Sequence, residues 1–152
     1  MTTERIELRE LLRILERRLG RVDESTKACC GITLAQCHAL VEVGRAEALS
    51  LNELAELLGL DKSTTSRTVD RLVRQGQVVR QTDTCCRRSV VIQLTKNGRT
   101  LFRSIEDRMD HYFRQLQAII PEARQAQVLD SLRLLVSAIG QLDADMDCAC
   151  TS

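Results

Sequence analysis

The chain has 152 residues and is nearly neutral overall, with 22 Lys and Arg against 21 Asp and Glu; 43% of its residues are hydrophobic but only 2% are aromatic. This length fits one domain, with or without an oligomerisation arm, and the scarcity of aromatic residues favours a helical core of Leu, Val, Ile and Ala. No apolar run approaches the ~20 residues that span a bilayer, and the charged, periodic N-terminus is not typical of a secretory signal. We therefore expect a cytoplasmic protein with no membrane partner.

The first third of the chain predicts two helices separated by a polar segment. Residues 4–19 place Leu and Ile at helical spacing with charged residues between them. The polar segment that follows ends in Cys29, Cys30 and Gly31. Thr33 then has the character of an N-cap, and we expect a second helix over about 34–45.

The next segment predicts two short helices joined by a tight turn. Ser50 and Glu53 form a capping-box pattern at the start of the first helix, and Gly59 ends it. Asp61 is placed to cap a second helix over about 62–75, with Gly76 as its stop. We expect Thr65, Val69, Leu72 and Val73 to point inward and Ser63, Arg67, Arg71 and Arg74 to point outward. Such a pair, with a polar and basic outer face, is typical of a helix-turn-helix.

A β-hairpin is predicted directly after this pair. Residues 78–82 form one strand and 89–94 the other, with Val90, Ile92 and Leu94 alternating inward. The linking segment, "DTCCRR", places Cys85 and Cys86 directly before Arg87 and Arg88. A hairpin after a recognition helix is the wing of a winged-helix domain, and its arginines suit phosphates or the minor groove.

The last third predicts two long helices. Thr95 caps a helix over about 96–119, Pro121 breaks it, and a final helix covers about 122–142. The first and last helices present more apolar surface than a small winged-helix core can cover, so we expect them to pack on a second copy of the chain. The expected fold is mainly α with a small β-hairpin wing, a winged helix-turn-helix with N- and C-terminal dimerisation helices.

The charges are distributed unevenly along the chain. Between Lys62 and Arg103 there are ten Lys and Arg against two acidic residues, Asp70 and Asp83. The rest of the chain holds twelve basic and nineteen acidic residues, so a net charge of +8 in the middle is offset by −7 outside it. A basic segment within an acidic chain indicates a nucleic-acid-binding face.

With these features in place, the chain resembles the multiple-antibiotic-resistance-regulator (MarR) family of winged-helix transcription factors. The residues that carry the resemblance are "LNELAELLGLDKSTTSRTVDRLVRQGQVVR" at 51–80 and "RRSVVIQLTKNGRTLF" at 87–102. The flanking helices also fit, so the resemblance covers essentially the whole chain. It implies a single domain over 1–152, in which 33–104 form the winged-helix DNA-binding region and 1–32 with 105–152 form the dimerisation arm.

The resemblance also implies a function and a set of contacts. A homodimeric repressor would bind double-stranded DNA at a pseudo-palindromic operator. One departure from the family pattern concerns the wing, where Cys86 stands in place of the acid that orients the wing arginines, and Asp83 is the nearest replacement. The candidate DNA contacts are Lys62, Ser63, Thr64, Thr65, Arg67, Arg71, Arg87 and Arg88, although Thr65 stands where the family often has an apolar core residue.

Seven cysteines are many for a cytoplasmic chain of this length and indicate metal or redox chemistry rather than a disulfide framework. Three thiolates suit a soft metalloid such as trivalent arsenic, and mercury and copper belong to the same thiophilic class. Zinc would take a fourth ligand, which His38 or the C-terminal cysteines could supply. The candidates fall into three groups: Cys29, Cys30 and Cys37; Cys85 and Cys86; Cys148 and Cys150.

Two other interpretations of these cysteines stay open. One is a thiol redox switch, in which a cysteine is oxidised and then resolved by another. The other is that Cys37 is a small core residue, the remaining cysteines are incidental, and the inducer is an organic molecule.

Few residues favour an enzyme. His38 and His111 are the only histidines and have no metal-hydrolase spacing, and the chain has neither a Gly-rich phosphate loop nor a Gly-x-Ser-x-Gly motif. A different class stays open, in which the basic face docks an acidic protein rather than DNA. Steep salt dependence together with a preference for one DNA sequence would distinguish the two.

Overall fold

The structure is a computed structural model that describes the backbone at residues 2–82 and 90–149 and the side chains at 2–22, 31–82 and 90–143. The chain comprises two compact units, Met1–Asp107 and Arg108–Ser152. In chain order the elements are α1 (Thr3–Cys30), α2 (Leu34–Ala46), β1 (Leu49–Ser50), α3 (Leu51–Leu58), α4 (Lys62–Arg74), β2 (Val78–Thr82), β3 (Val90–Leu94), α5 (Lys96–Ile119) and α6 (Glu122–Ala149).

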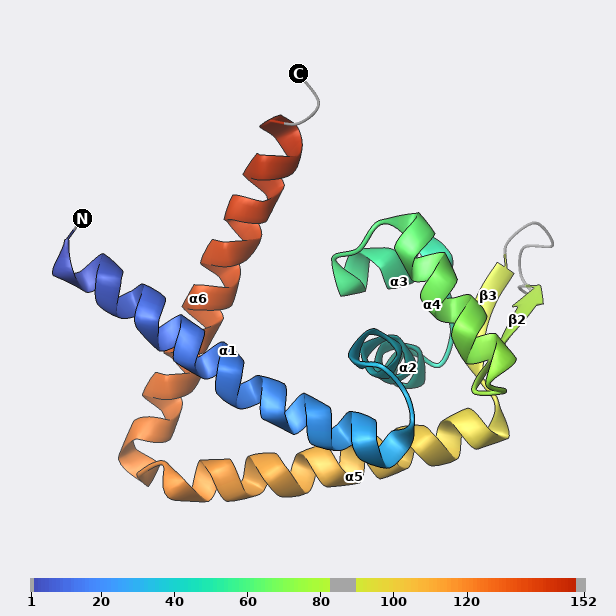
Figure 1. Ribbon diagram of the computed structural model, residues 1–152, viewed down its shortest axis with the longest axis horizontal. Helices are drawn as coiled ribbons and strands as arrows, with labels where there is room; N and C mark the ends of the chain where they lie inside the picture. The colour runs from blue at the N-terminus through green and yellow to red at the C-terminus, as the bar shows by residue number, and fades with distance from the viewer. Residues whose placement is uncertain (1, 83–89, 150–152) are drawn as a thin grey trace. The chain divides into compact units, whose positions relative to one another are not determined.

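The core lies in the first unit, where α2, α3 and α4 pack with a small sheet. Figure 1 shows the α3–α4 pair beside the hairpin formed by β2 and β3. The sheet is antiparallel with strand order β1-β3-β2, and Leu94 pairs with Val78 at the root of the hairpin. The largest fully buried side chains are Leu40, Val43, Leu54, Thr65, Val69, Leu72, Val78, Ile92 and Ile105.

The first half of α5 is held close to α2 and to the root of the hairpin. A Cβ added to Gly44 of α2 would lie 2.6 Å from the ring of Phe102, and Arg45 pairs with Glu106 at 3.2 Å. At the hairpin root, the Thr95 hydroxyl donates to the carbonyls of Gly76 and Gln77 and accepts from the Gly98 N–H. Thr95 therefore caps α5, as predicted, and also joins the turn after α4 to the end of β3.

Two helix ends differ from the prediction, and one short strand was not predicted. The first helix continues to Cys30 instead of ending near residue 19, because the expected polar segment contains no proline and is rich in residues that a helix tolerates. The last helix similarly extends to Ala149. β1 was not predicted, since a strand of two residues, Leu49 and Ser50, is too short to show alternation.

Two side chains expected to point inward are exposed. Val73 lies at the edge of the buried face of α4 and is 38% exposed. Val90 is 53% exposed, because it pairs with Thr82 at the end of the hairpin far from the core, whereas Ile92 and Leu94 are buried. The prediction for these two positions was wrong, although the helix and the strand that carry them are confirmed.

The terminal helices carry large exposed apolar side chains. On α1 this row follows the predicted helical spacing, and α6 carries a similar set. No helix in the described ranges combines the length and the apolar character that crossing a bilayer requires. The exposed apolar residues are Ile6, Leu8, Leu11, Ile14, Leu15 and Leu19 on α1 and Leu129, Leu132, Leu134, Val136, Ile139 and Leu142 on α6.

Candidate DNA-binding site

The α3–α4 pair is shaped by capping interactions that the local sequence specifies. The Ser50 hydroxyl accepts from the Glu53 N–H at 3.2 Å, and the Glu53 carboxylate accepts from the Ser50 N–H at 2.7 Å. The latter hydrogen bond holds the pKa of Glu53 below its usual value. Gly59 ends α3 in the left-handed region with φ +62°, where glycine carries no steric penalty. Both caps were predicted and are confirmed.

Asp61 begins α4 immediately after this turn. Its Oδ1 accepts from the Thr64 N–H at 2.8 Å, and its Oδ2 accepts from the Thr64 hydroxyl at 2.6 Å. The Thr64 hydroxyl lowers the pKa of the Asp61 carboxyl most, followed by the Thr64 N–H. Because the pKa is lower in the folded state, this cap stabilises the fold above the usual aspartate pKa and loses its contribution as the pH falls.

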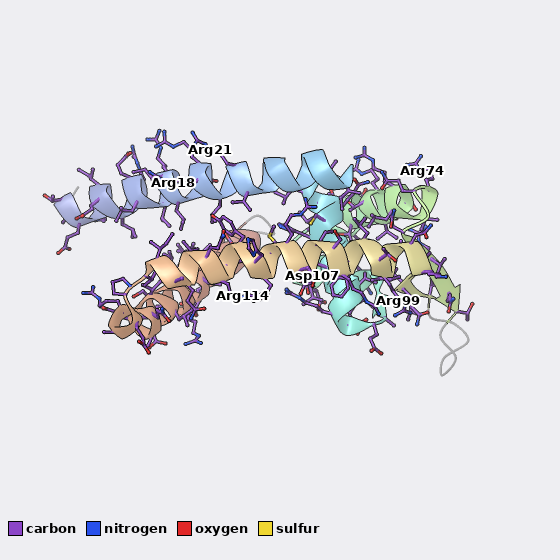
Figure 2. All side chains as sticks on the ribbon, turned by 90° about the horizontal axis from the view of Figure 1, so that it is seen from below. Arg18, Arg21, Arg74, Arg99, Asp107 and Arg114 are labelled. Carbon is purple, nitrogen blue, oxygen red and sulfur yellow. The ribbon has the colours of Figure 1, made fainter. Side chains whose placement is uncertain are left out.

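Helix α4 has a buried face and an exposed cationic face. Thr65, Thr68, Val69 and Leu72 are buried against the core. The opposite face exposes the predicted outward residues, and Figure 2 shows Arg74 at the surface of the helix. The exposed set consists of Lys62, Ser63, Arg67, Arg71 and Arg74. This face is exposed and positively charged, as contact with DNA phosphates and base edges requires.

An ion pair between α4 and β2 was not predicted. Arg80 of β2 donates from Nη1 to Oδ1 of Asp70 at 2.6 Å. The pair joins α4 to the first strand of the hairpin and gives Asp70, the one acidic residue of α4, a partner outside the helix. Its residues are ten positions apart, so no helical or strand spacing predicts the contact.

Comparisons with known proteins identify the family. The MarR family model matches residues 31–89, which include α2, α3, α4 and β2. The uncharacterized HTH-type transcriptional regulator YfiV of Bacillus subtilis (strain 168) is 33% identical over 122 residues, which cover 80% of this chain and 74% of YfiV. The chain belongs to the MarR family. Membership of this family of transcriptional regulators confirms that the protein is not an enzyme.

Solved structures confirm the predicted MarR fold. FabT of Streptococcus pneumoniae, whose crystal structure is a complex with DNA, superposes with a TM-score of 0.79 at 20% identity and covers 93% of this chain and 99% of its own. A MarR family protein from Bacillus stearothermophilus reaches a TM-score of 0.76 at 25% identity, with 92% and 99% coverage. Both similarities extend beyond the helix-turn-helix to the terminal helices.

Within this MarR fold, one candidate DNA contact must be corrected. Thr65 is completely buried, and its hydroxyl donates to the Asp61 carbonyl at 2.9 Å. A buried side chain cannot contact DNA, so Thr65 belongs to the core. Lys62, Ser63 and Arg67 are exposed, and Thr64 is half-buried. Arg71 is also exposed, whereas Arg87 and Arg88 lie outside the described residues.

The candidate cysteines are mostly outside the described side chains of this MarR protein. Cys37 is buried in α2. The backbone of Cys29 and Cys30 forms the last turn of α1, shortly before α2 begins at Leu34. Only the backbone of Cys148 is described, and it belongs to α6. Cys85, Cys86 and Cys150 lie outside the described residues. Among described side chains, no three His, Cys, Asp or Glu form a metal-binding group.

Proposed function

We propose that this MarR protein is a homodimeric repressor that inserts α4 into the major groove of a pseudo-palindromic operator. The observation that carries the proposal is the exposed cationic face of α4, opposite a face that is fully packed in the core. FabT, which shares the fold, was crystallised in complex with DNA. We assign direct or phosphate contacts to Lys62, Ser63, Arg67 and Arg71. Arg87 and Arg88 are assigned to the wing tip on the basis of the sequence.

The dimer is proposed from the exposed apolar rows of α1 and α6. Exposed apolar side chains are unfavourable in water, and packing against a second copy of the chain would bury them. A two-fold dimer presents two copies of α4, which read half-sites about 34–36 Å apart, one helical turn of DNA. The proposal therefore requires two chains for each operator duplex.

Replacing Arg67 by Ala is expected to weaken binding to the selected operator by ~1–3 kcal/mol and to relax the preference at one base position. The Arg67 side chain is exposed, we expect it to donate to a guanine, and its removal should leave the core of α4 unchanged. The operator is first selected by the wild-type protein from a randomised duplex library, and affinity is then measured by fluorescence anisotropy. The same titration gives the number of chains per duplex.

Lys62→Ala is the matched comparison, because Lys62 is exposed at the start of the same helix. It should weaken binding to all duplexes similarly and reduce by about 1 the slope of log affinity against log salt concentration, as loss of a phosphate contact does. Equal affinity of Arg67→Ala and wild type for the operator would remove Arg67 from the contact set. A wild-type protein that enriches no sequence would favour the protein-docking alternative.

We further propose that a thiol-reactive signal releases the repressor. The support is the grouping of seven cysteines in the sequence, with Cys29 and Cys30 at the end of α1 and the buried Cys37 in α2. Only Gly31, Ile32 and Thr33 separate the two helices. Ligation of a soft metal or metalloid at this junction would change how the dimerisation arm presents the two copies of α4. Release follows if the signal binds better to the spacing that does not fit DNA.

Anaerobically purified protein, bound to the labelled operator, should release it on addition of arsenite, Zn²⁺ or Hg²⁺, and thiol titration should show loss of reactive thiols. The double variant Cys29→Ser, Cys30→Ser should remain bound, whereas Cys85→Ser, Cys86→Ser tests the wing group separately. Release by peroxide alone, with disulfide formation, would support a redox switch instead. Unchanged binding under all of these reagents would contradict a thiol-reactive signal and favour an organic inducer.

A further inference from the structure

A chain of three side chains runs along the outer surface at the start of α4. Arg67 donates from Nη2 to the Thr64 hydroxyl at 3.2 Å, and that hydroxyl donates to Oδ2 of Asp61 at 2.6 Å. The residues follow each other at intervals of three, so one helical turn brings each beside the next. Asp61 and Arg67 are exposed, while Thr64 between them is half-buried.

The chemistry of Arg67 and Asp61 fixes which group donates and which accepts in these two hydrogen bonds. A guanidinium has only donors, and an ionised carboxylate has only acceptors. The Thr64 hydroxyl has a single proton, which it gives to Asp61, and it therefore accepts from Arg67. While the chain is intact, Thr64 has no proton to donate to a phosphate or a base.

Asp61 is held in place independently of Arg67, so it anchors the Asp61–Thr64–Arg67 hydrogen bonds. Its Oδ1 accepts from the Thr64 N–H at 2.8 Å, so the carboxylate is tied to the backbone of the helix. The same hydrogen bonds keep the pKa of Asp61 below its usual value, and the group stays ionised at neutral pH. The order of donors and acceptors is therefore constant across the physiological pH range.

We propose that Thr64 is a positioning residue that holds Arg67 ready to read one base pair, and that it determines sequence preference without contacting DNA. The proposal rests on the proposed placement of α4 in the major groove. Arg67 donates a single N–H to Thr64, and a guanidinium has five, so a forked pair remains for the two acceptors of a guanine. A long side chain that is already oriented loses less conformational freedom on binding.

The test is a double-mutant cycle on the duplex that the wild-type protein selects from a randomised library. Thr64→Val removes the hydroxyl at nearly constant shape, and Thr64→Ser retains it. In the wild-type background, Thr64→Val should weaken binding to the selected duplex about three- to thirtyfold, while Thr64→Ser should bind like the wild type. In the Arg67→Ala background, Thr64→Val should have no further effect.

Sequence preference provides a readout that a structural role would not change. Thr64→Val should reduce discrimination at the same base position as Arg67→Ala and leave the other positions unchanged. An equal loss from Thr64→Val in both backgrounds, or a loss that is uniform over all duplexes, would overturn the positioning role. In that case the wild-type selection still supports the proposed function, whereas the failure of wild type to enrich any sequence would overturn both.

Discussion

Replacing Leu72 by Ala is expected to lower the free energy of unfolding by about 2–5 kcal/mol, the largest effect that we predict for a single side chain. Leu72 is 1% exposed and lies on the face of α4 that packs on the core. Truncation removes buried apolar surface and leaves a cavity, because neighbours on α2, α3 and the sheet are held by their own contacts. The measurement is urea unfolding followed by circular dichroism at one fixed protein concentration.

Arg71→Ala is the matched control, since Arg71 precedes Leu72 on the same helix but is exposed. It should change the free energy of unfolding by less than about 0.5 kcal/mol and should weaken DNA binding instead. The two neighbouring positions thereby separate the stability of the recognition helix from its contacts. A Leu72→Ala protein as stable as the wild type would show that the core around α4 can collapse into the vacated space.

Gly98→Ala is expected to destabilise the fold by about 1–3 kcal/mol or more, because the added methyl group has no room. A Cβ at this position would lie 1.9 Å from the Gln77 carbonyl oxygen, which is backbone and accepts from the Thr95 N–H at 3.0 Å. The clash cannot be relieved by turning a side chain. Either α5 or the root of the hairpin must shift, and thermal unfolding should report a lower midpoint.

Gly20→Ala is the corresponding control within a helix. Gly20 lies in α1, and a Cβ there would meet nothing within 4 Å. Alanine should therefore leave stability unchanged or raise it by roughly 0.5–1 kcal/mol, because it restricts the unfolded chain. If both alanine variants unfolded at the same temperature, the close approach of α5 to the Gln77 carbonyl would be contradicted.

The attachment of the hairpin concerns function as well as stability. Thr95 and Gly98 fix its root to α5, and the Asp70–Arg80 ion pair joins its first strand to α4. The exposed pair contributes little to stability by itself. The ion pair instead restricts the movement of β2 relative to α4, the helix that carries Arg67. The recognition helix and the wing are thus presented together, which suits simultaneous contact with a groove and the adjacent phosphates.

Local signals in the sequence predicted the elements of the candidate site correctly. The caps at Ser50, Asp61 and Thr95 are recognisable because each involves residues only three apart, and such contacts need no knowledge of the fold. The alternation of buried and exposed positions on α4 was predicted for the same reason. The identity of the exposed residues, and thus the charge of the face, is a property of the sequence alone.

Predictions that required three-dimensional information failed or were not made. Thr65 was included among the DNA contacts because of the family resemblance, although its helical spacing predicted an inward position, and the packing of α4 buries it completely. Val90 continued the alternation of β3 into a part of the hairpin that extends beyond the core. The helical segment after residue 19 was missed because its composition is compatible with both a helix and a loop, and spacing alone does not decide between them.

By itself, the sequence determined the helix-turn-helix, the hairpin, the excess of positive charge between Lys62 and Arg103, and the resemblance to MarR proteins. These properties depend on residue type and short-range spacing, which fix hydrogen bonds within one helical turn or one strand. The tertiary structure decided between the two expectations for Thr65, in favour of the core, and it showed that Arg80 pairs with Asp70 and that Gly98 must lack a side chain. Burial and pairing between elements depend on which surfaces meet in space, and residues distant in sequence meet only after the helices and strands have packed.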